Sequence, residues 1–493
     1  MRVAFDPQLR FGSTPVLDVR LNTACRDEII PLLAALQHIY GRPVLRDDLL
    51  EAVAQDVNGT CRADRGRPGL TYWQVLVLAA VRLGCNLDYD KLQNLAEEHR
   101  SLRQIMGLGG WEEDETFDWR RLRDNICLLS PETIERVNPL IVAEGHRLVP
   151  EAAEAVRGDS FVVATDIHYP TDSGLIGDGL RQIVPQAVRL ADLLGVGGWR
   201  QHKHLLRALR RQLRVINKIA AGKGRDFQKR LRDGYRVLLD PADRILARAL
   251  ELLDPGLIVI SPGEDVARVN ALRTELTDSL DLTIRVCDLA RRRVLQGETI
   301  EHGEKLFSLF EPQTQLIVRG KVRQPVEFGH RVLVIEDGAG FVCHYAVLPH
   351  GAEDRDVLVG EMKQLQQRLK GRIRRASFDR GFHSPENQRA LAELVAQPCL
   401  PKTGRLQAER QEREATVEFR QTRRRHAGIE SAVGALQSGN GLERCRDHTF
   451  GGYCRYVGLG IPGRNLQVLG KLVIARRDET CVAGQSRRGR EAA

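Results

Sequence analysis

Apolar positions at helical spacing dominate residues 1–150 of the chain. They form a broad stripe along one face of segment 26–40, and they surround segment 73–83 almost completely. Two further segments, 89–99 and 119–129, continue the helical pattern. The pattern therefore predicts an all-α N-terminal domain, followed by a connecting helix and a domain boundary.

A different pattern, typical of strands, begins at Phe161. The run from Phe161 to Thr165 is β-branched and aromatic, and it is followed by Asp166 and by a break at Pro170. Alternation of side chains places Val162 and Asp166 on the same face. A carboxylate at the end of an apolar strand is costly to bury unless a cation, a metal or backbone donors compensate it. Asp166 is therefore a candidate functional residue, against the alternative that it only caps the turn at Pro170.

Strand-like patterns return after Lys305 and alternate with helices. The apolar runs are LFSLF, QLIVRG, HRVLVIED and FVCHYAVL, and a turn at 337–340 joins the last two. Another strand-like segment ends at Asp379. After one more helix and strand, Glu430 lies on a helix whose apolar seam contains Ile429, Val433 and Leu436. This order predicts an α/β fold over residues 151–475, with a mixed sheet and flanking helices.

A long, basic and largely helical insertion interrupts this pattern over residues 178–325. The segment from Arg200 to Arg236 contains thirteen Lys and Arg and only two Asp. Its net charge of 13 − 2 = +11 exceeds the net charge of +9 of the whole chain. At helical spacing the apolar residues fall on one side and the cations on another. A solvated surface usually mixes both signs, so we expect the cations to follow a phosphate backbone. The scarcity of aromatic residues favours duplex over single-stranded nucleic acid.

The overall composition is that of a globular protein with a polyanionic partner. With 493 residues, 42% of them hydrophobic, the chain is long enough for two or three domains. It contains no apolar run of membrane-spanning length, and its N-terminus lacks the pattern of a secretory signal. Ten cysteines without a CxxC pair are typical of reduced thiols. We therefore expect a cytoplasmic, nucleoid-associated protein. The neighbouring Cys445, His448 and Cys454 are weak indications of zinc.

Three carboxylates stand where the predicted strands and helices bring distant segments together. Asp166 and Asp379 each follow a strand, and Glu430 lies on a flanking helix. Converging acids repel one another unless divalent cations neutralise them, and such oxygen ligands suit Mg²⁺, with Mn²⁺ as a substitute. Two ions about 3.5–4 Å apart can activate a water or a 3′-hydroxyl at a phosphodiester. Three other acids compete for the first position, namely Asp159 in the predicted boundary turn, Asp172 and Asp178.

Several longer segments carry a family resemblance. They are GRPGLTYWQVLVLAAVRLGCNLDYDKL, VVATDIHYPTDSGLIGDGLR, KLFSLFEPQTQLIVRGK, SFDRGFHSPENQ, RRRHAGIESAVGAL and GLERCRDHTFGGYCRYVGLGIPGRNLQVLG. Through them the chain resembles insertion-sequence transposases of the DDE class, close to those grouped as ISNCY. The resemblance implies a ribonuclease-H-like catalytic fold with Asp166, Asp379 and Glu430 as its first, second and third acids. It also implies an enzyme that binds terminal inverted repeats, cuts the strand ends and joins them to target DNA as a dimer or larger assembly.

Two positions depart from the pattern of related transposases. Those proteins place an Arg four residues before the third acid and a Lys seven after it, where this chain has His426 and Gln437. Both side chains can still donate to a phosphate, His426 as a cation only when it is protonated. Together with the basic insertion, the expected DNA-contacting residues are Arg207, Arg210, Arg211, Arg214, Lys218, Lys321, Arg423, His426 and Gln437.

Two other classes of protein compete with an active transposase. A catalytically inactive derivative that binds DNA as a repressor would have no need of three acids beside phosphates. A general nuclease of the same fold would cut DNA without particular ends and without strand joining. The N-terminal helical domain either binds DNA ends or serves dimerisation and packing. Residues 476–493 are expected to form a disordered basic tail.

Overall fold

A computed structural model divides the chain into two compact units. It describes residues 2–5, 13–59, 69–109, 116–222, 224, 226–257, 264–318, 326–402 and 408–491. The larger unit combines residues 1–166 with 317–493, and the smaller unit spans residues 167–316. The chain therefore leaves the larger unit after Asp166 and returns to it at Ile317.

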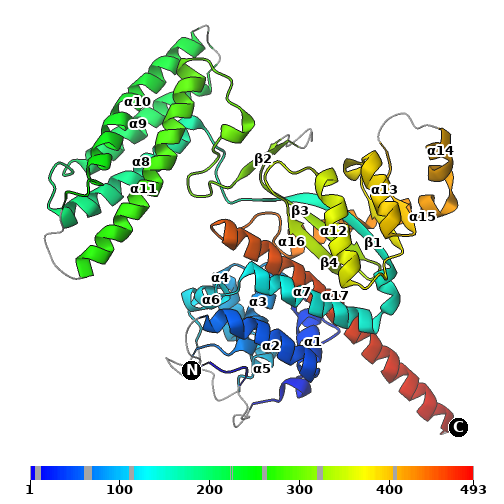
Figure 1. The fold of residues 1–493 in the computed structure, drawn as a ribbon. Helices are drawn as coiled ribbons and strands as arrows, with labels where there is room; N and C mark the ends of the chain where they lie inside the picture. The colour runs from blue at the N-terminus through cyan, green and yellow to red at the C-terminus, as the bar shows by residue number, and fades with distance from the viewer. Residues whose placement is uncertain are drawn as a thin grey trace. The chain divides into compact units, whose positions relative to one another are not determined.

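Among the described residues, seven α-helices make up the N-terminal part of the larger unit (Figure 1). Helix α3 is buried along almost its whole length, as its apolar sequence predicts. Thr71 caps it through reciprocal hydrogen bonds with Gln74, and Nε1 of Trp73 donates to the carbonyl of Ile105 at 2.7 Å. The helices are α1 (Ile29–Tyr40), α2 (Pro43–Asn58), α3 (Tyr72–Gly84), α4 (Tyr89–Glu98), α5 (Arg100–Ile105), α6 (Trp119–Ile126) and α7 (Pro131–Leu148), preceded by the 3-10 turn η1 (Val16–Asp18).

A mixed sheet of six strands follows the 3-10 turn η3 (Pro150–Glu154). The central strand β1 pairs antiparallel with β3 and parallel with β5, and β5 pairs in parallel with β6. The opposite edge of β3 carries β4, which is antiparallel to it, and β2. The strands are β1 (Ala155–Ala164), β2 (Gln315–Val318), β3 (Val326–Asp337), β4 (Val342–Val347), β5 (Arg375–Phe378) and β6 (Gln397–Cys399).

Shorter helices lie between and after the strands. Helix α12 packs against α13, α15 packs against β5 and β6, and α16 packs against β1. Because only Ala427 separates α15 from α16, the position of one helix constrains the other. These elements are α12 (Asp354–Arg368), η6 (Arg380–Phe382), α13 (Pro385–Leu394), α14 (Ala408–Ala415), α15 (Val417–His426) and α16 (Gly428–Gly439).

Helix α17 (Phe450–Glu491) connects the N-terminal helices to the sheet (Figure 1). It packs against α1, α3, α7 and β4. Gly470 lies so close to the carbonyl of Pro31 that a Cβ at that position would overlap it, and Gly463 lies against Gly84. One continuous apolar core therefore runs from α1 through the sheet. The N-terminal helices are not a separate compact unit, in contrast to the expected division at residue 150.

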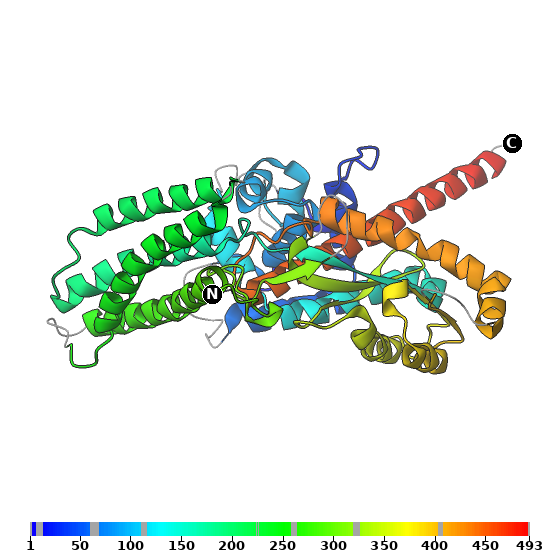
Figure 2. The same cartoon turned by 90° about the horizontal axis from the view of Figure 1, so that it is seen from above.

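Among its described residues, the smaller unit contains four long helices, which bury a core of their own (Figure 2). Helix α8 contacts the other three, and its N-terminus is capped by Thr171, whose side chain accepts from the N–H of Gly174. The compact unit covers residues 167–316, whereas the expected insertion covered 178–325. The helices are α8 (Asp172–Leu194), α9 (His202–Ala220), α10 (Phe227–Glu251) and α11 (Glu264–Ala290), followed by the π-helical turn η4 (Arg291–Leu295) and the 3-10 turn η5 (His302–Glu304).

The structure confirms a mixed α/β chain and moves two predicted boundaries. Strand β1 begins at Ala155, where a connecting helix was expected, and not at Phe161. Pairing with β3 and β5 extends the strand over a stretch whose polar side chains hid it from the apolar pattern. The tail expected to be disordered from residue 476 instead continues α17 to Glu491. None of the described helices is long and apolar enough to cross a membrane.

Candidate functional site

The parallel pairing of β1 with β5 decides which acids are neighbours. The register pairs Arg157 with Ser377 and runs to the last residue of β5. Two positions further along, Asp159 stands beside Asp379, whose backbone is still extended at φ −73° and ψ 170°. Adjacent strands lie about 4.8 Å apart, and side chains two residues apart share a face. The carboxylates of Asp159 and Asp379 therefore project from adjacent positions on the face that carries Arg157 and Ser377.

Asp166, expected as the first acid, lies outside this pair. It follows Asp159 by seven residues, which at about 3.3 Å per residue separates the two Cα atoms by about 23 Å. Asp166 there accepts a hydrogen bond from Nη1 of Arg444 at 3.2 Å, and both side chains are more than half exposed. The expectation that Asp166 meets Asp379 is therefore wrong. Because β1 starts earlier than its apolar pattern indicates, Asp159 takes the paired position.

Glu430 approaches the same face from helix α16. Nδ1 of His426 lies 3.3 Å from Oγ of Ser377. Nη1 of Arg157 donates to a carbonyl in the last turn of α15 at 2.9 Å. These contacts hold the junction of α15 and α16 over the strand positions just before the acid pair. Burial lowers the pKa of His426, while the nearby carboxylates of Asp379 and Glu430 act in the opposite direction.

The carboxylates of Asp159, Asp379 and Glu430 form a candidate site for divalent cations. Carboxylate oxygens are the ligands that Mg²⁺ prefers. Asp379 and Glu430 are exposed and Asp159 is half-buried, with Oδ1 oriented by the N–H of Ser160 at 2.7 Å. Among the described residues, this trio is not a group whose ligand atoms all lie within 4.8 Å of one another.

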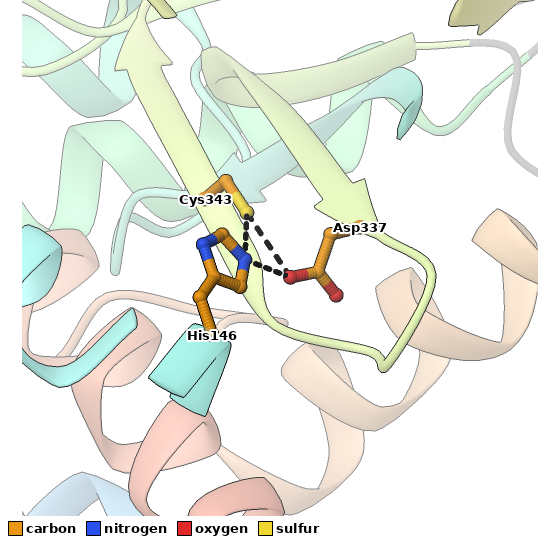
Figure 3. Close-up of side chains that lie close together, drawn as sticks. All are labelled: His146, Asp337 and Cys343. Carbon is orange, nitrogen blue, oxygen red and sulfur yellow. Dashed lines mark hydrogen bonds and ion pairs between the residues drawn. The ribbon is translucent and has the colours of Figure 1, made fainter. Parts of the chain in front are cut away.

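One group with that closer spacing is His146, Asp337 and Cys343, buried between α7 and the β3–β4 hairpin (Figure 3). Nε2 of His146 lies 2.7 Å from Oδ2 of Asp337, and Sγ of Cys343 donates to the same oxygen at 3.4 Å. Nη2 of Arg372 donates to Nδ1 of His146 at 3.1 Å. Since an Arg side chain can only donate, the imidazole proton must be on Nε2, where it is donated to Asp337.

The contacts of this buried cluster favour a structural role. A metal on Nε2 of His146 would require the imidazole proton on Nδ1, where it would face the guanidinium of Arg372. Burial raises the pKa of the Cys343 thiol well above its ordinary value, and Asp337 adds to this effect. A protonated thiol is a poor metal ligand. We therefore interpret the cluster as a hydrogen-bonded link that fastens α7 to the β3–β4 hairpin.

The cations expected to contact DNA lie mainly on the exposed side of α9. Leu209 and Ile216 are buried in the core of the smaller unit. On α15 and α16, Arg423 is exposed and Gln437 is half-buried, while Lys321 lies outside the described residues. Five of the expected residues are exposed cations of α9, and within the part of the chain that the structure describes no acid forms an ion pair with them: Arg207, Arg210, Arg211, Arg214 and Lys218.

The two remaining candidates for the first acid belong to the smaller unit. The carboxylate of Asp172 pairs with Nη2 of Arg293 at 2.5 Å. Asp178 is buried and lies 3.2 Å from Nε2 of His168, and it also pairs with Arg181. Both acids therefore have local partners that account for their positions.

The possible zinc ligands at 445–454 do not assemble into a site. Sγ of the buried Cys445 donates to the carbonyl of Asp447 at 3.3 Å. Among the described residues, Cys445, His448 and Cys454 are not a group whose ligand atoms all lie within 4.8 Å of one another. The structure therefore gives no support to zinc at this loop.

A signal for Asp159 is present in the sequence but is weak. From Val156 to Asp159 uncharged and charged residues alternate in the sequence, and the structure buries Val156 and Gly158 while Arg157 and Asp159 share the half-buried side. Alternation of this kind is typical of a strand with one covered face. The signal was missed because polar side chains in this stretch carry no apolar periodicity.

Comparisons with known proteins identify no relative. The chain matches no family model, no curated protein and no solved structure. The site is therefore defined by its own residues and by the register of the strands that carry them.

Proposed function

We propose that the chain is an enzyme that cuts and joins DNA strands, an insertion-sequence transposase of the DDE class and of ISNCY type. The observation that carries this proposal is the parallel register of β1 and β5, which ends at Gly158 and Phe378, so that Asp159 and Asp379 are the next residues along the two strands. A helix packed against β1 brings Glu430 to the same face. The segments that resemble the DDE transposases include the strand end at Asp379 and the helix of Glu430.

The arrangement of the sheet supports a ribonuclease-H-like fold. Leaving aside β2, the strand order is β4-β3-β1-β5-β6, with β3 antiparallel to β1 and with β5 and β6 parallel to it. We propose that this is the ribonuclease-H-like sheet that the resemblance implies. Asp159 lies on its central strand, Asp379 directly follows the adjacent parallel strand, and Glu430 lies on a later helix.

The three carboxylates would hold two Mg²⁺ ions, for which Mn²⁺ can substitute. When bound, such ions supply the positive charge that activates a water or a 3′-hydroxyl and stabilises the leaving oxygen of a phosphodiester. The protein contributes orientation, because two of its acids lie at the pairing of two strands and the third on a helix packed against the sheet.

Double-stranded DNA is the proposed substrate, as terminal inverted repeats and as target. The exposed cations of α9, which lack acidic partners among the described residues, suit contacts with duplex phosphates. Arg423 is exposed on the helix that precedes α16 and suits a similar contact beside the acids. We propose that the protein acts on the nucleoid in the cytoplasm, as a homodimer or larger assembly.

Cleavage of DNA that carries the element's own ends tests this proposal. In Mg²⁺ the full-length protein is expected to cut at the ends and to join them to target DNA. Asp379→Asn and Glu430→Gln are expected to abolish both reactions while end binding in a mobility-shift assay persists. Glu418→Gln is the matched control, since Glu418 is an exposed acid on the adjacent helix α15.

Each alternative protein class predicts a different result in the same assay. End binding without any cutting, in Mg²⁺ or in Mn²⁺, would replace the transposase with an inactive DNA-binding derivative. Cutting without a requirement for particular ends, and without strand joining, would indicate a general nuclease. Normal cutting by either acid variant would refute the assignment of the site.

A further inference from the structure

The strand positions just before the acid pair carry two side chains that contact the α15–α16 junction. Arg157 on β1 and Ser377 on β5 are partners in the register. Oγ of Ser377 lies 3.3 Å from Nδ1 of His426, the last residue of α15. Nη1 of Arg157 donates to the carbonyl of Arg425 at 2.9 Å. Two neighbouring strands therefore fix the start of the helix that carries Glu430.

Arg157 is itself held from the other side by strand β3. Its Nε and Nη2 reach Oε2 of Glu336 at 2.7 and 2.5 Å. Burial raises the pKa of Glu336, which is only 2% exposed, and Arg157 opposes that effect. A buried carboxylate needs such a partner, so the guanidinium is confined to one place. The planar group thereby becomes a fixed support, with little freedom to move aside.

Gly428, the first residue of α16, lies directly against this support. A Cβ built on Gly428 would overlap Nη1 and Cζ of Arg157. The same helix contains Gly434, where an added Cβ would meet nothing within 4 Å. Glycine is therefore required at 428 by the guanidinium, and it is not required at 434.

We propose that Arg157, seated against Gly428, is a positioning residue that sets the place of Glu430 over Asp159 and Asp379, and with it the affinity of the site for divalent cations. This inference rests on the proposed function. Glu430 follows Gly428 by two residues, so a displacement of the helix start is passed to its carboxylate. Ligand distances around a metal ion are fixed to within about 0.2 Å. A shift the size of a methyl group is therefore large for the site.

Binding of Mn²⁺ to the full-length protein without DNA, followed by electron paramagnetic resonance, tests the inference. Gly428→Ala is expected to weaken Mn²⁺ binding about tenfold or more, while the matched Gly434→Ala stays within about twofold of wild type. Alanine is the better helix former at both positions. Thermal unfolding is therefore expected to show both variants folded, so a loss of binding does not reflect a loss of fold.

A second variant and a second measurement complete the test. Arg157→Lys keeps a charge beside Glu336 but loses the planar group that contacts Gly428, and it is expected to weaken Mn²⁺ binding as well. In the cleavage assay, the Mg²⁺ concentration for half-maximal activity is expected to rise about tenfold for Gly428→Ala and to stay unchanged for Gly434→Ala.

The outcomes separate this inference from the function on which it rests. Equal Mn²⁺ affinity in the two alanine variants, with binding lost in Asp379→Asn, overturns the positioning role and leaves the proposed function intact. If the wild-type protein binds no Mn²⁺ that depends on Asp379, the proposed function fails and the positioning role fails with it.

Discussion

Replacing Asp159 and Asp166 separately by asparagine tests which of them is the first acid of the site. The register of β1 and β5 indicates Asp159, whereas the apolar pattern of the sequence indicated Asp166. Asparagine keeps the size of the side chain and removes its charge. Oδ1 of Asp159 accepts from the N–H of Ser160 at 2.7 Å, and an amide oxygen can accept the same bond. The fold is therefore expected to survive Asp159→Asn while the site loses a cation ligand.

The expected sizes of the two effects differ by orders of magnitude. A bound ion contributes several kcal/mol of charge stabilisation, and each 1.36 kcal/mol is a factor of ten in rate. Loss of a ligand at Asp159 should thus slow cleavage by about a thousandfold or more. At about 23 Å in water, the charge of Asp166 acts on the site with only about 0.2 kcal/mol, before screening by salt. Asp166→Asn should therefore change the rate by less than about 1.5-fold.

Stability provides the internal control for this comparison. The ion pair of Asp166 with Arg444 is more than half exposed on both sides, so its loss costs at most about 1 kcal/mol. Single-turnover cleavage of labelled element ends in Mg²⁺ measures the rates, and a mobility-shift assay confirms that DNA still binds. Equal losses in both variants, or an Asp159→Asn protein within tenfold of wild type, would refute the assignment drawn from the β1–β5 register.

Three further predictions concern packing, pH and DNA. Gly470→Ala should lower the free energy of unfolding, measured in urea, by about 1–3 kcal/mol, because the added Cβ would overlap a carbonyl of α1. Gly451→Ala is the control and should leave this free energy unchanged, because its Cβ would meet no atom within 4 Å. Burial lowers the pKa of His330 from 6.5 to about 4, so the unfolded chain takes up the proton first. The contribution of His330 to stability is then complete above about pH 6.5 and falls toward pH 4. His330→Phe should remove roughly 2.5 kcal/mol of the loss between pH 7.5 and 4.5, as measured by urea unfolding at both values. Replacing single cations of α9 by glutamine should reduce the slope of log K for DNA binding against log salt concentration by about 0.9 per lost phosphate contact. Arg236→Gln is the control and should not change this slope, because Arg236 is already paired with Asp233. The cations to replace are Arg207, Arg211, Arg214 and Lys218.

The local sequence pattern was sufficient to predict those helices that pack into the core through their own apolar face. The stripe of α1 and the apolar surround of α3 are buried as their spacing indicates. The seam of α16 is likewise covered, with Ile429 and Leu436 buried and Glu430 exposed beside them. In each case the apolar residues that indicate the helix are also the residues that it buries, so a short window of sequence is enough to predict both the helix and its buried face.

Local pattern failed where a distant partner decides the structure. Arg157 can lie in β1 because Glu336, 179 residues away, takes up its charge. The start of β1, and with it the role of Asp159, therefore depends on pairing that no short window contains. The join between the N-terminal helices and the sheet was missed for the same reason, because it depends on the contact of Gly470 with Pro31.

The position of α17 has a consequence for how the protein is made. Helix α17 follows every other described element along the chain, yet it covers the apolar sides of α1, α3 and α7. During synthesis those helices leave the ribosome long before their partner does, so their folding is completed late. A protein truncated by a stop codon before Phe450 lacks α17, so the apolar sides of α1, α3 and α7 stay exposed, and it is expected to be degraded.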